Sequence, residues 1–219
     1  CGHQDGAEIR EATLALLSLS RNGVDVEIFA PDINQSKVTN HLTGKVTSET
    51  RNVLEEAARI ARGKITRLSE LKARNFDALI IPGGFGVATN LSDFALKGSN
   101  ATVLPEFSSV LHDFISSGKP IGAICIAPAV IAVALGAKYA PVVTIGEDID
   151  VIKQIELAGG RHVNCKTENI VVDERNRIVS CSAYMRDDEL WRVAEGIDKM
   201  VAKIYQMVEG VEAPSVAVA

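Results

Sequence analysis

The sequence predicts a single α/β domain built on a mostly parallel sheet. Short apolar runs, typical of strands buried on both faces, alternate with longer stretches of helical periodicity, and the links between them are brief. The chain has 219 residues, of which 47% are hydrophobic, so it can bury a full core within one domain. We expect that domain to span residues 1–209 and a flexible tail to follow over 210–219.

Each element follows from its apolar period and from the glycine, proline and asparagine signals at its ends. Helices are predicted over Ala7–Asn22, Ser48–Arg62, Leu104–Ser117, Ile126–Leu135, Ile149–Ala158 and Asp187–Val208. Parallel strands are predicted over Val24–Ala30, Ala78–Ile81, Pro120–Ile124 and Val142–Ile145. A hairpin signature, Asp173-Glu174-Arg175-Asn176, joins two further strands over Asn169–Val172 and Arg177–Cys181.

Two stretches in the first half of the chain are less regular. Asp32–Thr47 is polar and rich in turn residues. A helical pattern begins almost at once after Cys1, without the strand that an α/β fold places before its first helix. We therefore expect a short apolar strand to precede Cys1.

Charge and hydropathy argue against several classes of partner. The 23 Lys and Arg residues against 28 Asp and Glu residues give a net charge of −5, which disfavours nucleic acid and anionic membranes. No uninterrupted apolar stretch reaches the roughly 18 residues of a membrane span. The four cysteines form no C-x-x-C pair, which favours free thiols in a reducing compartment. We expect the cytoplasm, or an organellar matrix if a targeting segment has been removed.

The strongest candidate for chemistry is Cys125. A buried strand ends at Ile124, one residue turns sharply, and an apolar helix begins at Ile126 with Pro128 in its first turn. Such an elbow presents its middle residue at the carboxyl edge of the sheet, beside free N–H groups at a helix start that stabilise a thiolate. The alternative is an inert core cysteine, since free cysteines are often buried.

Two further features are predicted to lie at the same edge. Pro82-Gly83-Gly84-Phe85-Gly86 follows a strand, so a glycine N–H there could serve as an oxyanion donor; the alternative is a plain glycine turn, and the Lys-Ser/Thr of a phosphate loop is missing. Glu8 lies at the start of the first helix, where a carboxyl beside a thiolate would be pushed toward its protonated form and could carry a proton. The alternative for Glu8 is a helix-start carboxylate stabilised by the helix dipole.

The histidines give no clear metal site. His162-x-x-Cys165 resembles half of one, but no matching second half is present, and His112 falls in a surface helix. His3 and His41 lie in loops that could reach the active edge, either as proton carriers or as solvated side chains. We therefore expect neither a metal nor a cofactor.

Taken together, several segments resemble the DJ-1/PfpI branch of the class I glutamine amidotransferase-like superfamily, and within it the ElbB-type glyoxalases, once called isoprenoid or lycopene enhancing proteins. The resemblance covers roughly Cys1–Glu209. The segments that carry it are Cys1-Gly2, Asp5-Gly6-Ala7-Glu8-Ile9, Phe29-Ala30-Pro31-Asp32, Asn40-His41-Leu42-Thr43-Gly44, Thr50-Arg51-Asn52-Val53-Leu54, Pro82-Gly83-Gly84-Phe85-Gly86, Cys125-Ile126-Ala127-Pro128 and Ala183-Tyr184-Met185.

This resemblance implies a flavodoxin-like three-layer sandwich, commonly dimeric, whose chains open with a strand before the position of Cys1. It implies that Cys125 is the nucleophile, that Glu8 is its carboxyl partner, and that the backbone N–H groups of Gly84 and Ile126 are oxyanion donors. PfpI-type proteases and many relatives carry a histidine directly after the nucleophile. Ile126 occupies that position here, as in ElbB-type members, which argues against amide hydrolysis.

The function implied is a glutathione-independent, cofactor-free glyoxalase that converts glyoxal-type dicarbonyls to hydroxy acids. The alternative is a non-enzymatic redox-sensing or interaction protein whose Cys125 oxidises without turnover. The expected partners are a small dicarbonyl substrate and a second copy of the chain, with no nucleic acid and no membrane.

Overall fold

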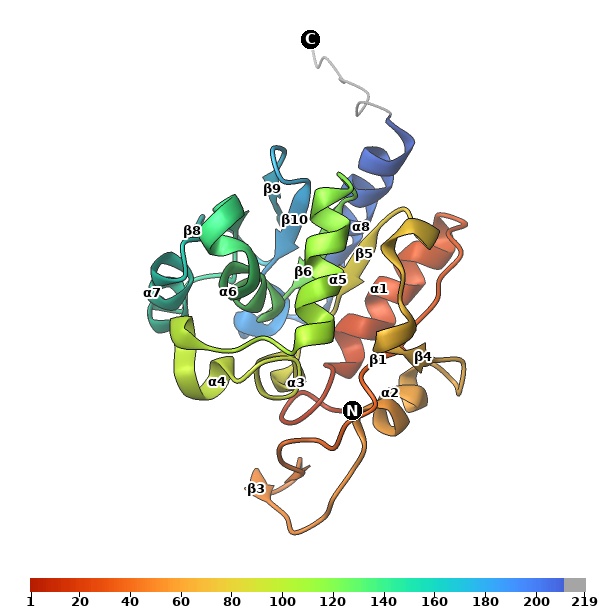
Figure 1. The fold of residues 1–219 in the computed structure, drawn as a ribbon, viewed down its shortest axis with the longest axis vertical. Coiled ribbons are helices and arrows are strands. Elements are labelled where there is room, and N and C mark those ends of the chain that lie inside the picture. Colours follow the sequence, from red (N-terminus) through yellow and green to blue (C-terminus); the bar gives the residue numbers. More distant parts are fainter. Residues whose placement is uncertain (211–219) are drawn as a thin grey trace.

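Helices cover both faces of a central sheet in the structure, a computed structural model that describes residues 1–210 (Figure 1). The helices are α1 Ile9–Arg21, α2 Val53–Ile60, α3 Phe85–Thr89, α4 Phe94–Lys97, α5 Pro105–Ser116, α6 Ala127–Tyr139, α7 Ile149–Leu157 and α8 Leu190–Glu209. The strands are β1 Phe29–Ala30, β2 Thr39–Asn40, β3 Lys45–Val46, β4 Thr66–Arg67, β5 Leu79–Ile81, β6 Ile121–Ile124, β7 Val142–Val143, β8 Arg161–His162, β9 Val171–Asp173 and β10 Ile178–Cys181. Apart from Gly210, the tail predicted over 210–219 lies outside the described residues.

The main sheet has the strand order β5-β6-β10-β9. Ile121 of β6 is in register with Leu79 of β5 and with Ile178 of β10, and both pairings are parallel. Only β9 runs antiparallel, because it forms the hairpin with β10. The predicted α/β class, its mostly parallel sheet and its hairpin near the C-terminus are therefore confirmed.

The three layers follow from burial on both faces of β6. Ile121 and Ala123 pack into the core beneath α5 and α6, whereas Ile124 packs into a second core with α1 and α8. Figure 1 shows the same arrangement, with α5 and α6 on one side of β6 and with α1 and α8 on the other. Every residue of β6 is buried, which explains its continuous apolar sequence.

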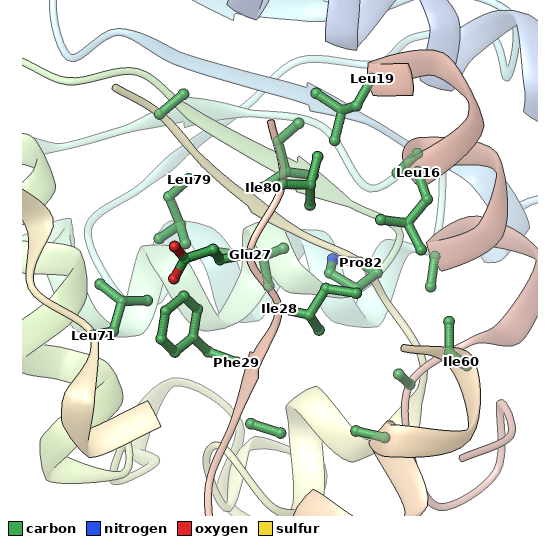
Figure 2. Close-up of a pocket in the computed structure, with 18 of the residues that line it drawn as sticks. Leu16, Leu19, Glu27, Ile28, Phe29, Ile60, Leu71, Leu79, Ile80 and Pro82 are labelled. Carbon is green, nitrogen blue, oxygen red and sulfur yellow. The ribbon is translucent and has the colours of Figure 1, made fainter. Parts of the chain in front are cut away.

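A second pair of strands lies apart from this sheet. Strand β1 pairs in parallel with β4, and no ladder within residues 1–210 joins β1 to β5. A cavity of about 790 Å³ separates them. Its walls are mostly apolar and include Leu16 and Leu19 of α1, Ile28 and Phe29 of the β1 segment, and Ile80 of β5 (Figure 2). An apolar strand before Cys1 would enter the molecule here, because Cys1 also lines this cavity; that strand stays a prediction.

Several predicted boundaries differ from those observed; for example, α6 continues to Tyr139 instead of ending at Leu135, and α8 begins at Leu190 instead of Asp187. The strand expected over Val24–Ala30 pairs only at Phe29–Ala30, because its other edge faces the cavity. The polar stretch Asp32–Thr47 contains the hairpin β2–β3, which extends from the body of the molecule in Figure 1. Helix α2 begins at Val53 rather than Ser48, because the Asn52 side chain caps it by accepting from the Glu55 N–H at 3.1 Å. None of the helices described is both long and apolar enough to cross a membrane.

Candidate active site

Cys125 lies on a strained turn between β6 and α6. Its φ is 62°, in the left-handed region that non-glycine residues rarely adopt. The turn is held by the pairing of β6 with β10, since the Cys125 N–H donates to the Cys181 carbonyl at 3.0 Å. The residue is 7% exposed, so its thiol lies at the carboxyl edge of the sheet but almost entirely within the protein.

Two backbone N–H groups point at the Cys125 sulfur. One belongs to Gly84 and the other to Ile126, at the start of α6, and each lowers the pKa of the thiol by favouring its charged form. The positive end of the 13-residue helix α6 acts in the same direction. The two residues expected to supply oxyanion donors therefore lie beside the sulfur.

The glycines of the Pro82–Gly86 segment allow the loop to approach the elbow closely. A Cβ on Gly83 would lie 2.3 Å from the Cys125 Cβ and 2.6 Å from Glu11 Oε2. Gly84 has a φ of 98°, and a Cβ there would lie 2.3 Å from the Gly6 carbonyl oxygen. The loop is therefore more than a plain turn: its missing side chains make room for the thiol and its neighbours.

The carboxyl partner of Cys125 in the structure is Glu11. Its side chain is fully buried and hydrogen-bonded to the Cys125 thiol. Its two oxygens also accept backbone hydrogen bonds, Oε2 from Gly83 at 2.9 Å and Oε1 from Tyr184 at 3.3 Å. Three segments that are distant in the sequence therefore converge on one carboxyl group.

Glu8, which the family resemblance implied as the carboxyl partner of Cys125, lies elsewhere in the structure. It is the N-cap of α1, and its Oε2 accepts from the Glu11 N–H at 2.6 Å. Glu8 therefore has the geometry of the alternative, a carboxylate at the start of a helix. Glu11, and not Glu8, contacts Cys125. The sequence did contain a signal for Glu11, because it shares the buried face of α1 with Ala12, Ala15 and Ser18. A glutamate on a buried face is rare unless a partner binds its carboxyl group.

Burial controls the electrostatics of the Glu11–Cys125 pair. It raises the pKa of the Glu11 carboxyl to about 7, although the hydrogen bonds from Cys125, Tyr184 and Gly83 lower that pKa. Burial, and then the charge of Glu11, raise the pKa of the Cys125 thiol well above its ordinary value. Because two adjacent buried negative charges are unfavourable, the pair keeps at least one proton.

The predicted histidine positions are spread over the molecule. His3 and His41 stack edge to face, with ring centroids 5.2 Å apart, on the loop after Cys1 and on the β2–β3 hairpin. His112 lies on α5 with its Nδ1 2.8 Å from the Ser108 carbonyl oxygen, and His162 ends β8. Within residues 1–210, no group of three or more His, Cys, Asp and Glu side chains converges as a metal ligand set would.

Comparison with known proteins places this geometry in a family. The DJ-1/PfpI family pattern matches residues 3–187. The human "glutamine amidotransferase-like class 1 domain-containing protein 3, mitochondrial" is 42% identical over 217 residues, covering 94% of this chain and 80% of the human protein. The rat "ES1 protein homolog, mitochondrial" shows the same identity and the same coverage.

The chain is also similar to a solved structure. The isoprenoid biosynthesis protein with an amidotransferase-like domain from Ehrlichia chaffeensis is 44% identical, with a TM-score of 0.90 and coverage of 95% of both chains. Its fold and the elbow described above are consistent with the flavodoxin-like sandwich that the sequence resemblance implied. The chain belongs to the DJ-1/PfpI family.

Proposed function

We propose that this chain is a glutathione-independent, cofactor-free glyoxalase that converts 2-oxoaldehydes to 2-hydroxy acids. The observation that carries the proposal is the contact of a buried carboxyl, Glu11, with the Cys125 thiol beneath two backbone N–H donors. Isomerising an oxoaldehyde requires a nucleophile, a site for an oxyanion and one group that can both accept and return a proton. These three components lie within one buried cluster.

The chemistry would begin with attack of the Cys125 thiolate on the aldehyde carbon, which forms a C–S bond and a hemithioacetal. The new oxyanion would be held by the N–H groups of Gly84 and Ile126 and take its proton from Glu11. The Glu11 carboxylate would then remove the proton from the same carbon and return it to the neighbouring ketone carbon, while the hydroxyl proton of the hemithioacetal passes to the ketone oxygen. This leaves a thioester of a 2-hydroxy acid on Cys125.

Water would then cleave the C–S bond, releasing the hydroxy acid and restoring the thiol. The aldehyde carbon is oxidised to the acid while the adjacent ketone carbon is reduced to the alcohol, so no external oxidant, reductant or cofactor is needed. A Glu11 pKa of about 7 suits a group that must both take and give a proton near neutral pH.

The test is turnover of methylglyoxal without glutathione, measured as lactate. The wild-type chain, Cys125→Ala and the control Cys165→Ala are compared at equal concentration; Cys165 is a half-buried thiol elsewhere in the fold. We expect many turnovers for the wild type and Cys165→Ala, and none for Cys125→Ala. Equal lactate from wild type and Cys125→Ala would reject the proposal.

A redox-sensing role without turnover is the competing proposal. It is favoured by the same N–H donors, which would also hold the oxygens of an oxidised Cys125. Stoichiometric reaction with peroxide and no lactate would favour that role. Both roles need a thiol kept reduced, so we propose a reducing compartment, either the cytoplasm or the mitochondrial matrix. The names of the human and rat relatives describe those proteins as mitochondrial.

A further inference from the structure

A second, smaller cavity lies beside Phe85, the residue that follows Gly84. It has a volume of about 320 Å³ and lies between the loop after Cys1, the β2–β3 hairpin and Phe85 at the start of α3. Phe85 connects it to the site, because the preceding residue, Gly84, directs its N–H at the Cys125 sulfur. The Phe85 N–H donates to the His3 carbonyl at 2.8 Å, which fixes the loop against α3. The cavity and the nucleophile are therefore linked through the Gly84–Phe85 backbone.

The lining of the cavity favours a negative group. Lys37 contributes an ammonium group that lies 5.3 Å from the centroid of the Phe85 ring and forms no salt bridge within the described part of the chain. His3 and Gln4 add side chains that can donate hydrogen bonds, and the lining contains no Asp or Glu. In a chain with a net charge of −5, this is a local concentration of cationic and donor groups.

One polar atom in this wall lacks a partner. The Thr39 side chain lines the cavity, and its hydroxyl is buried without any hydrogen bond in the structure. A buried hydroxyl without a partner costs free energy that a bound acceptor would recover. The rest of the wall is fixed: the Thr39 N–H donates to Asp5 Oδ2 at 2.7 Å, and His41 Nδ1 lies 3.0 Å from the Thr39 carbonyl oxygen.

We propose that this cavity is a specificity subsite that binds a carboxylate at the far end of the substrate, with Lys37 as its principal cation and Thr39 as a donor. The inference rests on the proposed function for the class of substrate: a 2-oxoaldehyde with a carboxylate remote from its aldehyde. Phe85 provides the apolar surface between the two ends; its side chain is 50% exposed, and no other described segment covers it completely. Methylglyoxal would then be a minimal substrate that leaves the subsite empty.

The kinetic test compares two substrates of nearly the same shape, phenylglyoxal and 4-carboxyphenylglyoxal, with wild type, Lys37→Gln and Lys45→Gln. Lys45 is the control because it is an exposed lysine of the same hairpin that does not line the cavity. We expect Lys37→Gln to lower kcat/KM for the carboxylated substrate about tenfold, through KM, because a charge-assisted contact is lost. We expect phenylglyoxal to change less than about twofold in either variant. An equal effect of Lys37→Gln on both substrates would overturn the proposal.

A binding test separates the subsite from the glyoxalase reaction. 4-Acetylbenzoate and acetophenone lack the reactive aldehyde, and calorimetry can measure their binding to the same three proteins. We expect wild type and Lys45→Gln to bind 4-acetylbenzoate about tenfold more tightly than acetophenone, and Lys37→Gln to lose the preference. This result would support the subsite even if no dicarbonyl were turned over. Equal binding of the two compounds, no binding of either, or a preference that survives Lys37→Gln would overturn it.

Discussion

Glu11 and Cys125 are hydrogen-bonded in the interior of the protein, although one lies on the first helix and the other on the elbow after β6. Neither group could remain there fully charged beside the other without a large penalty. A side chain on Gly83 would overlap both residues, and the Tyr184 N–H donates to the same Glu11 carboxyl.

Glu11→Gln should lower the pKa of the Cys125 thiol. Burial makes the largest contribution to the raised pKa of Cys125, and the Glu11 charge makes the next. Removing that charge leaves burial and the two N–H donors in place, so the thiolate becomes easier to form. The rate of alkylation by iodoacetamide, measured against pH, reports this pKa. Glu8→Gln is the control, and a titration of Cys125 that is unchanged or higher in Glu11→Gln would contradict the prediction.

Glu11 should also make the protein less stable as the pH rises from about 4.5 to about 7. Its pKa is raised above the 4.5 of an unperturbed carboxyl, so the folded state binds this proton more tightly than the unfolded state does. The stabilisation is therefore complete below pH 4.5 and is lost as the pH rises toward 7. The free energy of unfolding of wild type relative to Glu11→Gln should fall by about 3 kcal/mol across that range. Urea titrations of both proteins at several pH values measure it, and a flat difference would refute it.

Gly83→Ala should damage both the fold and the site. The added methyl group would overlap the Cys125 Cβ and the Glu11 carboxyl, at a cost of about 2 to 3 kcal/mol. Gly118→Ala is the matched control: nothing lies within 4 Å of a Cβ there, and only its φ of 66° is unfavourable, which costs about 1 kcal/mol. Gly83→Ala should lower both the temperature of thermal unfolding and the rate of lactate formation. Gly118→Ala should lower only the unfolding temperature. Equal effects on activity would show that the close approach at Gly83 is unimportant.

An apolar strand placed before Cys1 should stabilise the chain. The cavity between β1 and β5 has mostly apolar walls, and the two strands beside it are not joined to each other. Fusing Val-Val-Val-Ile-Leu ahead of Cys1 should raise the free energy of unfolding by about 3 kcal/mol, because apolar side chains would fill both faces of the gap. The control fusion carries Asp at the second and fourth positions. Equal stability of the two fusions would show that the added segment does not enter the cavity.

The elbow was predictable because its signals are local. The apolar run before Cys125, the single turning residue and Pro128 in the first turn of α6 determine that geometry within eight residues. The mostly parallel sheet and the β9–β10 hairpin were likewise predicted from short patterns, although β1 and β7 pair in separate two-stranded ladders. The ends of several elements moved, as where the Asn52 cap decided the first residue of α2. The short strands β2, β3, β4 and β8 and the short helices α3 and α4 were not predicted.

The carboxyl partner and the subsite depended on tertiary packing. Glu8 and Glu11 lie one helical turn apart, and only the docking of Gly83 and Tyr184 onto α1 shows which of them meets the thiol. The β2–β3 hairpin pairs only Thr39–Asn40 with Lys45–Val46, so its Val and Thr residues gave a short strand signal inside a polar stretch. That signal did not reveal that Lys37 and Thr39 would line one cavity with Phe85. Such contacts arise from long-range pairings that no local pattern contains.

The conversion of methylglyoxal to lactate by Glu11→Gln and Glu8→Gln shows which carboxyl group moves the substrate proton. If Glu11 moves the substrate proton, Glu11→Gln should lower kcat at least about a hundredfold, as expected for loss of a general acid–base group. Glu8→Gln should retain kcat within about threefold, because an amide oxygen can still accept the Glu11 N–H at the helix cap. Circular dichroism and thermal unfolding would confirm that both variants are folded. A Glu11→Gln protein that keeps its kcat, or a loss confined to Glu8→Gln, would contradict the assignment of the proton shuttle to Glu11.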